Sequence, residues 1–110
     1  MKVFVYGTLK KGFGNHFLLK DSQFIKVDKV SGLMYNIGPF PGAVPAKGDN
    51  PLHGEIYEID ETTLQRLDRL EGVPHLYRRE TEKTSSGEEV FIYWFNGHTE
   101  GRPIFGGIWK

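Results

Sequence analysis

The chain has 110 residues, no cysteine, and fourteen basic side chains that balance fourteen acidic ones. This length predicts a single domain over residues 1–110, and the lack of cysteine excludes disulfides and thiolate metal sites. A zero net charge argues against a nucleic-acid binder, which usually carries a basic excess. No apolar run reaches the roughly 20 residues of a membrane span, and the N-terminal run is too short for a signal peptide. We therefore expect a cytoplasmic protein that binds neither nucleic acid nor membrane.

The first predicted element is a strand. Residues 2–6 form a short apolar run that ends at Gly7. Three glycines predict that residues 7–15 turn, and residues 16–20 are compatible with a short helix. The N-terminal region is therefore expected to be a strand, a glycine-rich loop and a helical turn.

The middle of the chain predicts two further strands separated by a loop. Apolar residues alternate loosely over 23–35, which indicates a strand that Gly32 can break. Four of the six prolines and three glycines fall in residues 36–51, which predicts a long irregular loop. The alternation over 53–59 then predicts another strand.

Residues 61–71 form the clearest predicted helix. Asp60 is a favourable N-cap, and Gly72 and Pro74 are expected to end the helix. An apolar stripe at a spacing of three residues is predicted from Leu64, Leu67 and Leu70.

The C-terminal third predicts a hairpin and a docked tail. Residues 76–83 and 88–95 read as two strands joined by a turn around residues 85–87. The second strand is apolar on both faces, which is typical of a central strand. The aromatic residues in the tail, 96–110, indicate that it packs on the body. Together the elements predict a mostly-β domain with a curved or barrel-like sheet and one good helix.

Glu71 stands out because of its phase on the predicted helix. It lies four residues after Leu67 and seven after Leu64, on the apolar side. Burial and the negative end of the helix dipole would both raise the pKa of its carboxyl group toward neutrality, where proton transfer is useful. The alternative is that Glu71 bends out to water or pairs with Arg78 or Arg79.

Three other stretches offer pocket residues. Gly7, at a strand end, allows successive backbone N–H groups to form an anion-binding nest, and Thr8 adds a hydroxyl group; an ordinary turn is the alternative. Phe40 lies between two prolines and could form a pocket wall, and Tyr77 could hydrogen-bond a ligand. The alternatives are a packed loop and a half-buried strand tyrosine. The four histidines are scattered and form no local metal-ligand pair.

Four motifs in order resemble the γ-glutamylcyclotransferase-like superfamily, and within it the γ-glutamylamine cyclotransferase and AIG2-like branch. The resemblance covers residues 2–95. Its motifs are FVYGTLKKG at 4–12, YNIGPFPGAV at 35–44, HGEIYEID at 53–60, and LDRLEG at 67–72 with YRR at 77–79.

This resemblance implies an α+β fold, namely a small mixed β-barrel flanked by short helices. It also implies a reaction in which the α-amine of a small γ-glutamyl substrate attacks its own γ-carbonyl, giving 5-oxoproline and a free amine, without metal or cofactor. Glu71 would be the catalytic acid and base, and the glutamyl end would be held by Tyr6, Gly7, Thr8 and Leu9. Phe40 and Tyr77 complete the expected pocket. We expect a monomer or weak homodimer. The alternative is a non-catalytic module that binds a small ligand or a protein through the same pocket.

Overall fold

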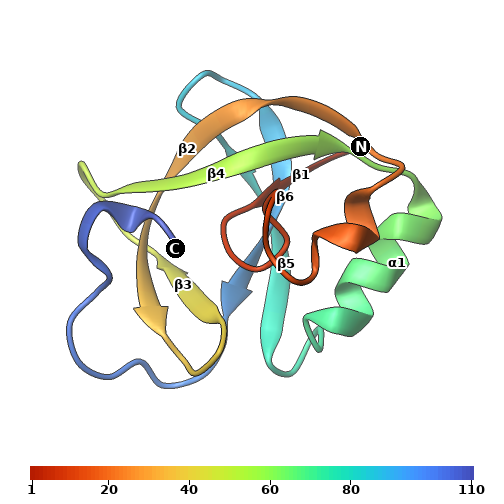
Figure 1. The fold of residues 1–110 in the computed structure, drawn as a ribbon. Coiled ribbons are helices and arrows are strands. Elements are labelled where there is room, and N and C mark those ends of the chain that lie inside the picture. The colour runs from red at the N-terminus through yellow and green to blue at the C-terminus, as the bar shows by residue number, and fades with distance from the viewer.

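The computed structural model describes all 110 residues, which form one curled sheet with a single α-helix beside it (Figure 1). The strands are β1 (Lys2–Val5), β2 (Gln23–Asn36), β3 (Pro41–Pro45), β4 (Pro51–Glu58), β5 (Tyr77–Lys83) and β6 (Glu89–Phe95). The helix is α1 (Glu61–Leu70), and two short 3-10 turns are η1 (His16–Leu19) and η2 (Phe105–Gly107).

The six strands form a mixed sheet in the order β3-β2-β4-β1-β6-β5. β1 and β6 run parallel, whereas the other neighbouring strands are antiparallel. The sheet curls until its β3 edge approaches β6, so that a Cβ on Gly42 would lie 2.7 Å from Cγ of Phe95. The result is a half-barrel with short helices, which confirms the predicted α+β class and barrel-like sheet.

Two apolar clusters cover the two faces of this sheet. Val3 and Val5 of β1 pack on one face with Leu64 and Leu67 of α1. Phe4 points to the opposite face and packs with Trp94 in the cluster inside the curl. α1 and η1 therefore lie on one side of the sheet and the C-terminal segment on the other (Figure 1). β6 contributes buried residues to both clusters, which confirms that it is covered on both faces.

The predicted loop over residues 36–51 is wrong in part, because it contains β3. β3 pairs antiparallel with the end of β2, from Gly32↔Pro45 to Asn36↔Pro41. Its two prolines are tolerated because β3 is the edge strand of the sheet. Gly32 does not break β2, and a Cβ there would lie 3.0 Å from Cζ3 of Trp94. This glycine therefore leaves room for the indole ring.

The C-terminal tail docks on the body, as predicted. Ile104 and Trp109 pack against the inner cluster, and the Ile104 amide donates to the Met34 carbonyl at 2.6 Å. Lys10 Nζ donates to the Trp109 carbonyl at 2.9 Å. The tail thus covers part of the cluster inside the curl. No helix in this fold is long and apolar enough to span a membrane.

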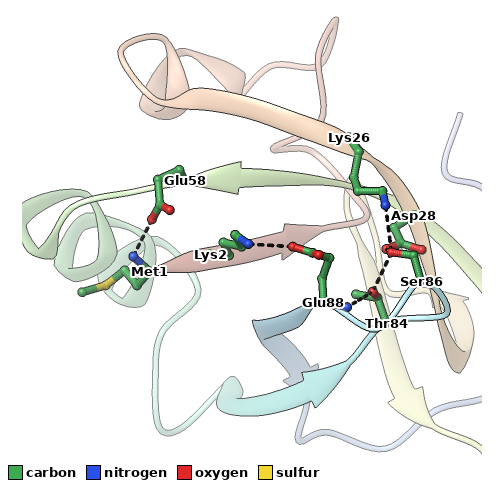
Figure 2. Close-up of polar contacts among 8 residues, drawn as sticks. All are labelled: Met1, Lys2, Lys26, Asp28, Glu58, Thr84, Ser86 and Glu88. Carbon is green, nitrogen blue, oxygen red and sulfur yellow. Dashed lines mark hydrogen bonds and ion pairs between the residues drawn. The ribbon is translucent and has the colours of Figure 1, made fainter.

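Polar contacts fix the β5–β6 turn against β1 and β2 (Figure 2). The Ser86 hydroxyl donates to Asp28 at 2.6 Å, and Lys2 pairs with Glu88 at 2.6 Å. The N-terminal ammonium pairs with Glu58 on β4. Water screens ion pairs of this kind, so each contributes little to the stability of the fold. None of these residues lines the pocket described next, so the charged network is separate from the candidate site.

Candidate active site

A cavity of about 270 Å³ opens where the end of β1, the start of β3, the end of α1 and the start of β5 meet. These elements are distant in sequence and converge because the sheet curls. All seven residues singled out in the sequence line this cavity: Tyr6, Gly7, Thr8, Leu9, Phe40, Glu71 and Tyr77. The structure therefore brings the whole predicted site together.

Glu71 is the C-cap residue of α1, and its half-buried carboxylate makes no hydrogen bond or ion pair within the protein. Burial without a partner disfavours the charged form and raises the pKa of Glu71 to about 7. The group can therefore exchange a proton near neutral pH. A carboxylate held by an arginine would instead remain ionised there.

The two nearby arginines are paired elsewhere. Arg79 pairs with Asp68, one turn before Glu71 on α1, and Arg78 pairs with Glu80 at 2.9 Å. Asp68 also accepts a hydrogen bond from the Tyr93 hydroxyl at 2.7 Å. The alternative in which Glu71 pairs with Arg78 or Arg79 is therefore wrong. Arg79 pairs with Asp68, and no arginine pairs with Glu71.

The end of α1 sets the direction of Glu71. Gly72 has a φ of +64°, and its amide donates to the Arg69 carbonyl at 3.2 Å. The Val73 amide donates to the Asp68 carbonyl at 3.0 Å. This pair of bonds is a Schellman motif, which stops the helix directly after Glu71 and satisfies its last carbonyls. The helix ends one residue earlier than predicted, so Glu71 leads directly into this turn.

Replacing Gly72 with Ala is expected to destabilise the fold by about 1–2 kcal/mol, because side chains are strained at positive φ. The new Cβ would also lie 3.2 Å from Cβ of Leu76. Urea unfolding measures the loss, with Gly101→Ala as the control, since Gly101 has a φ of +76° but no heavy atom within 4 Å of an added Cβ. Gly72→Ala should lower the free energy of unfolding by more than Gly101→Ala does. An equal loss would contradict a special role for this helix end.

The loop after β1 supplies free hydrogen-bond donors. The backbone N–H groups of Gly7, Thr8 and Leu9 have no acceptor in the protein. Asn15 holds this loop in place, because it donates through its backbone to the Thr8 carbonyl at 3.0 Å and through Nδ2 to the Thr8 hydroxyl at 2.9 Å. Successive free N–H groups on a fixed loop are suited to binding an anion such as a carboxylate.

Gly7 also permits a close approach between this loop and the start of β3. A Cβ on Gly7 would lie 2.7 Å from Cγ of Pro41. Any larger residue would push the two walls of the pocket apart. The glycine is required here for space, since its φ is not in the left-handed region.

Three buried tyrosines, Tyr6, Tyr77 and Tyr93, line the pocket. The Tyr6 hydroxyl donates to the Tyr93 carbonyl at 2.6 Å, and the Tyr77 hydroxyl donates to the Pro41 carbonyl at 2.6 Å. Burial raises the pKa of the three phenols above their ordinary value, and the nearby Glu71 charge adds to the effect. All three therefore stay neutral, and each hydroxyl proton is already engaged in a hydrogen bond within the protein.

Sequence reasoning missed four important lining residues: Asn15, Leu70, Leu76 and Tyr93. Leu70 was expected in the core stripe, but the residue is 41% exposed and lines the pocket. The helix phase explains this correction, because Glu71 rather than Leu70 continues the buried face set by Leu64 and Leu67. Asn15 has a local signal, since it lies at the end of the glycine-rich loop that it holds. No group of three or more His, Cys, Asp or Glu side chains is placed to hold a metal ion.

Comparisons with known proteins agree with this geometry. Residues 3–110 match the family described as "Gamma-glutamyl cyclotransferase, AIG2-like". A Vibrio cholerae protein, named only provisionally as a gamma-glutamylcyclotransferase, is 45% identical over 94 residues, which are 83% of this chain and 80% of that protein.

Two solved structures share the fold. A crystal structure of an uncharacterized protein from Pyrococcus horikoshii has a TM-score of 0.82 and 31% identity, and the match covers 98% of this chain and 88% of that one. A crystal structure of an AIG2-like protein from Mus musculus has a TM-score of 0.80 and 28% identity, covering 89% of this chain and 78% of that one. The chain therefore belongs to the AIG2-like γ-glutamylcyclotransferase family.

Proposed function

We propose that this protein converts a γ-glutamyl amine or peptide into 5-oxoproline and a free amine. The observation that carries the proposal is the unpaired carboxyl of Glu71, which shares a pocket with the free N–H groups of Gly7, Thr8 and Leu9. One group can move a proton and the others can hold a carboxylate. Membership in the γ-glutamylcyclotransferase family supports the same reaction class.

In the proposed mechanism, Glu71 begins as a carboxylate. It removes a proton from the α-ammonium of the substrate, and the resulting amine attacks the γ-carbonyl carbon of the same molecule. A new C–N bond closes the five-membered ring and leaves a negatively charged oxygen. The bond to the leaving nitrogen then breaks, and that nitrogen takes the proton from Glu71. The ring nitrogen loses its second proton to the released amine, which departs as an ammonium ion and leaves neutral 5-oxoproline in its lactam form. Protons balance over the cycle, and Glu71 returns to its starting form.

The pocket contributes mainly by holding the substrate bent. The α-carboxylate binds the N–H groups of the 7–9 loop, which places the adjacent α-ammonium in the cavity that Glu71 faces. An intramolecular attack from a fixed geometry can lower the barrier by several kcal/mol. A pKa of about 7 suits Glu71 to both of its roles, since it must accept and then return the same proton.

Incubation of the protein with a set of γ-glutamyl amides tests the proposal. Liquid chromatography should detect 5-oxoproline and the free amine in equal amounts. Release of glutamate instead would show hydrolysis and contradict ring closure. Ligand binding without any product would favour the non-catalytic module.

The pH dependence of the rate gives a second test. Because Glu71 must be ionised to accept the proton, kcat/KM is expected to fall about tenfold for each pH unit below about 7. Steady-state rates between pH 5 and pH 8 measure this limb. A profile that is flat through this range would exclude a carboxyl group with the raised pKa as the base.

A further inference from the structure

Lys10 is buried directly after the 7–9 loop. Only 9% of the residue is exposed, although lysines are rarely buried in folded proteins unless they are paired. Its amine lies 5.2 Å from the centre of the Phe13 ring and makes no ion pair. Burial lowers the pKa of this ammonium group. Because burying a charge is unfavourable, the position of Lys10 requires a structural explanation.

The hydrogen-bond partner of this amine lies at the other end of the chain. Lys10 Nζ donates to the Trp109 carbonyl at 2.9 Å. Trp109 packs against the cluster inside the curl, and the Ile104 amide donates to the Met34 carbonyl on β2. The C-terminal segment is thus fixed on the sheet and lies beside the loop that follows β1 (Figure 1). The Lys10 amine therefore has an acceptor that is itself held in place.

Lys10 also ends the turn that carries the free N–H groups. Its backbone amide donates to the Gly7 carbonyl at 3.1 Å, which closes a turn over residues 7–10. The side chain of Lys10 does not line the active-site cavity, whereas residues 7–9 all do. Lys10 thus contacts the cavity only through the backbone of this turn.

Few hydrogen bonds connect this turn to the rest of the protein. Asn15 and His16, which follow it closely in the chain, bond to carbonyls of the 7–9 loop. Among the hydrogen bonds of residues 7–13, two reach distant segments. One joins the Lys11 amide to Glu55 on β4 at 2.9 Å, and the other joins the Lys10 amine to the C-terminal segment.

Resting on the proposed function, we propose that Lys10 is a positioning residue. By donating to the Trp109 carbonyl, it holds the 7–9 loop in the conformation that binds the α-carboxylate of the substrate. The C-terminal segment thereby supports substrate binding, although it contributes no residue to the cavity. A loop that is already ordered binds its ligand more tightly, because less conformational entropy is lost on binding.

The order of the loop in the free protein gives the first test, which is independent of the reaction. Lys10→Met keeps an apolar side chain and removes the donor. ¹⁵N relaxation should show lower order parameters for the backbone amides of the 7–9 loop in this variant than in the wild type. Lys11→Met is the matched control, since Lys11 is exposed and its amine makes no hydrogen bond or ion pair. This control should keep the wild-type order parameters.

Two ligands test the consequence for binding. 5-Oxoproline and 2-pyrrolidinone have the same lactam ring and differ only by one carboxylate. In NMR titrations, Lys10→Met should raise the Kd of 5-oxoproline at least about threefold and leave that of 2-pyrrolidinone unchanged. Trp109→Ala tests the same bond from the acceptor side, because it releases the C-terminal segment from its cluster. It should weaken 5-oxoproline binding in the wild type, with little further loss in Lys10→Met.

Unchanged order parameters in Lys10→Met, or an unchanged Kd for 5-oxoproline, would overturn the positioning role and leave the proposed function intact. An equal loss for both ligands would also overturn it, since the effect would then not depend on the carboxylate. Additive losses from Lys10→Met and Trp109→Ala would show that the two residues act independently, which contradicts the proposal. A wild type that neither binds 5-oxoproline nor releases it from any γ-glutamyl amide would overturn both proposals.

Discussion

Replacing Glu71 with Gln is expected to lower kcat for 5-oxoproline release by about 10²- to 10⁴-fold, the usual contribution of general acid and base catalysis. The amide keeps the shape of the side chain and removes its ability to carry a proton. Because Glu71 makes no hydrogen bond or ion pair in the protein, the substitution breaks no structural contact. Product formation over time, followed by chromatography, measures the loss.

Glu89→Gln is the matched control for this experiment. Glu89 is exposed on β6, and its side chain makes no hydrogen bond or ion pair. Glu89→Gln makes the same chemical change away from the pocket, so this variant should retain the wild-type rate. Wild-type turnover in Glu71→Gln would contradict the assignment of Glu71 as the proton carrier, even if the protein releases 5-oxoproline.

Glu71→Gln is also expected to stabilise the folded protein at high pH, by up to about 3 kcal/mol. Burial raises the pKa of Glu71 from 4.5 to about 7, and each tenfold change in an ionisation constant corresponds to about 1.4 kcal/mol. A raised acid pKa means that the folded state binds more protons than the unfolded state between these two values. The contribution of Glu71 to wild-type stability, measured relative to Glu71→Gln, should therefore fall as pH rises from 4.5 to about 7 and then remain level.

Urea unfolding of the wild type and Glu71→Gln at pH 4.5 and pH 8 measures this linkage. The two proteins should have similar free energies of unfolding at pH 4.5, where Glu71 is largely protonated in the folded state. At pH 8 the variant should be the more stable one. A wild type that is as stable as the variant at pH 8 would show that the carboxyl is well solvated or has a partner.

The sequence predicted those parts of the site that depend on local rules. The phase of Glu71 on α1 follows from its spacing to Leu64 and Leu67, and the helix end follows from Gly72. The apolar run over residues 2–6 and the glycine-rich loop after it are likewise local signals, and β1 ends one residue before the end of that run. In these cases the residues that determine the structure lie within about two helical turns or one strand of the feature.

The remaining features depend on contacts between distant segments. β3 was missed because its prolines indicate a loop, and only its edge position against β2 makes them tolerable. The Tyr77 hydroxyl is committed to the Pro41 carbonyl, 36 residues away. Leu76 carries no local sign of exposure, because the turn after Gly72 and the bond from Asn96 place it. Predicting the positions of these residues requires knowledge of the topology of the whole sheet, because their partners are distant in the sequence.

The proposed chemistry depends on Glu71 exchanging a proton near neutral pH because it is half-buried without a partner. An NMR titration of its side-chain carboxyl carbon in ¹³C-labelled protein measures this property directly, with the resonance assigned by its loss in Glu71→Gln. The structure predicts a midpoint of about 7. A midpoint between about 4 and 5, the range of an ordinary solvated glutamate, would contradict it.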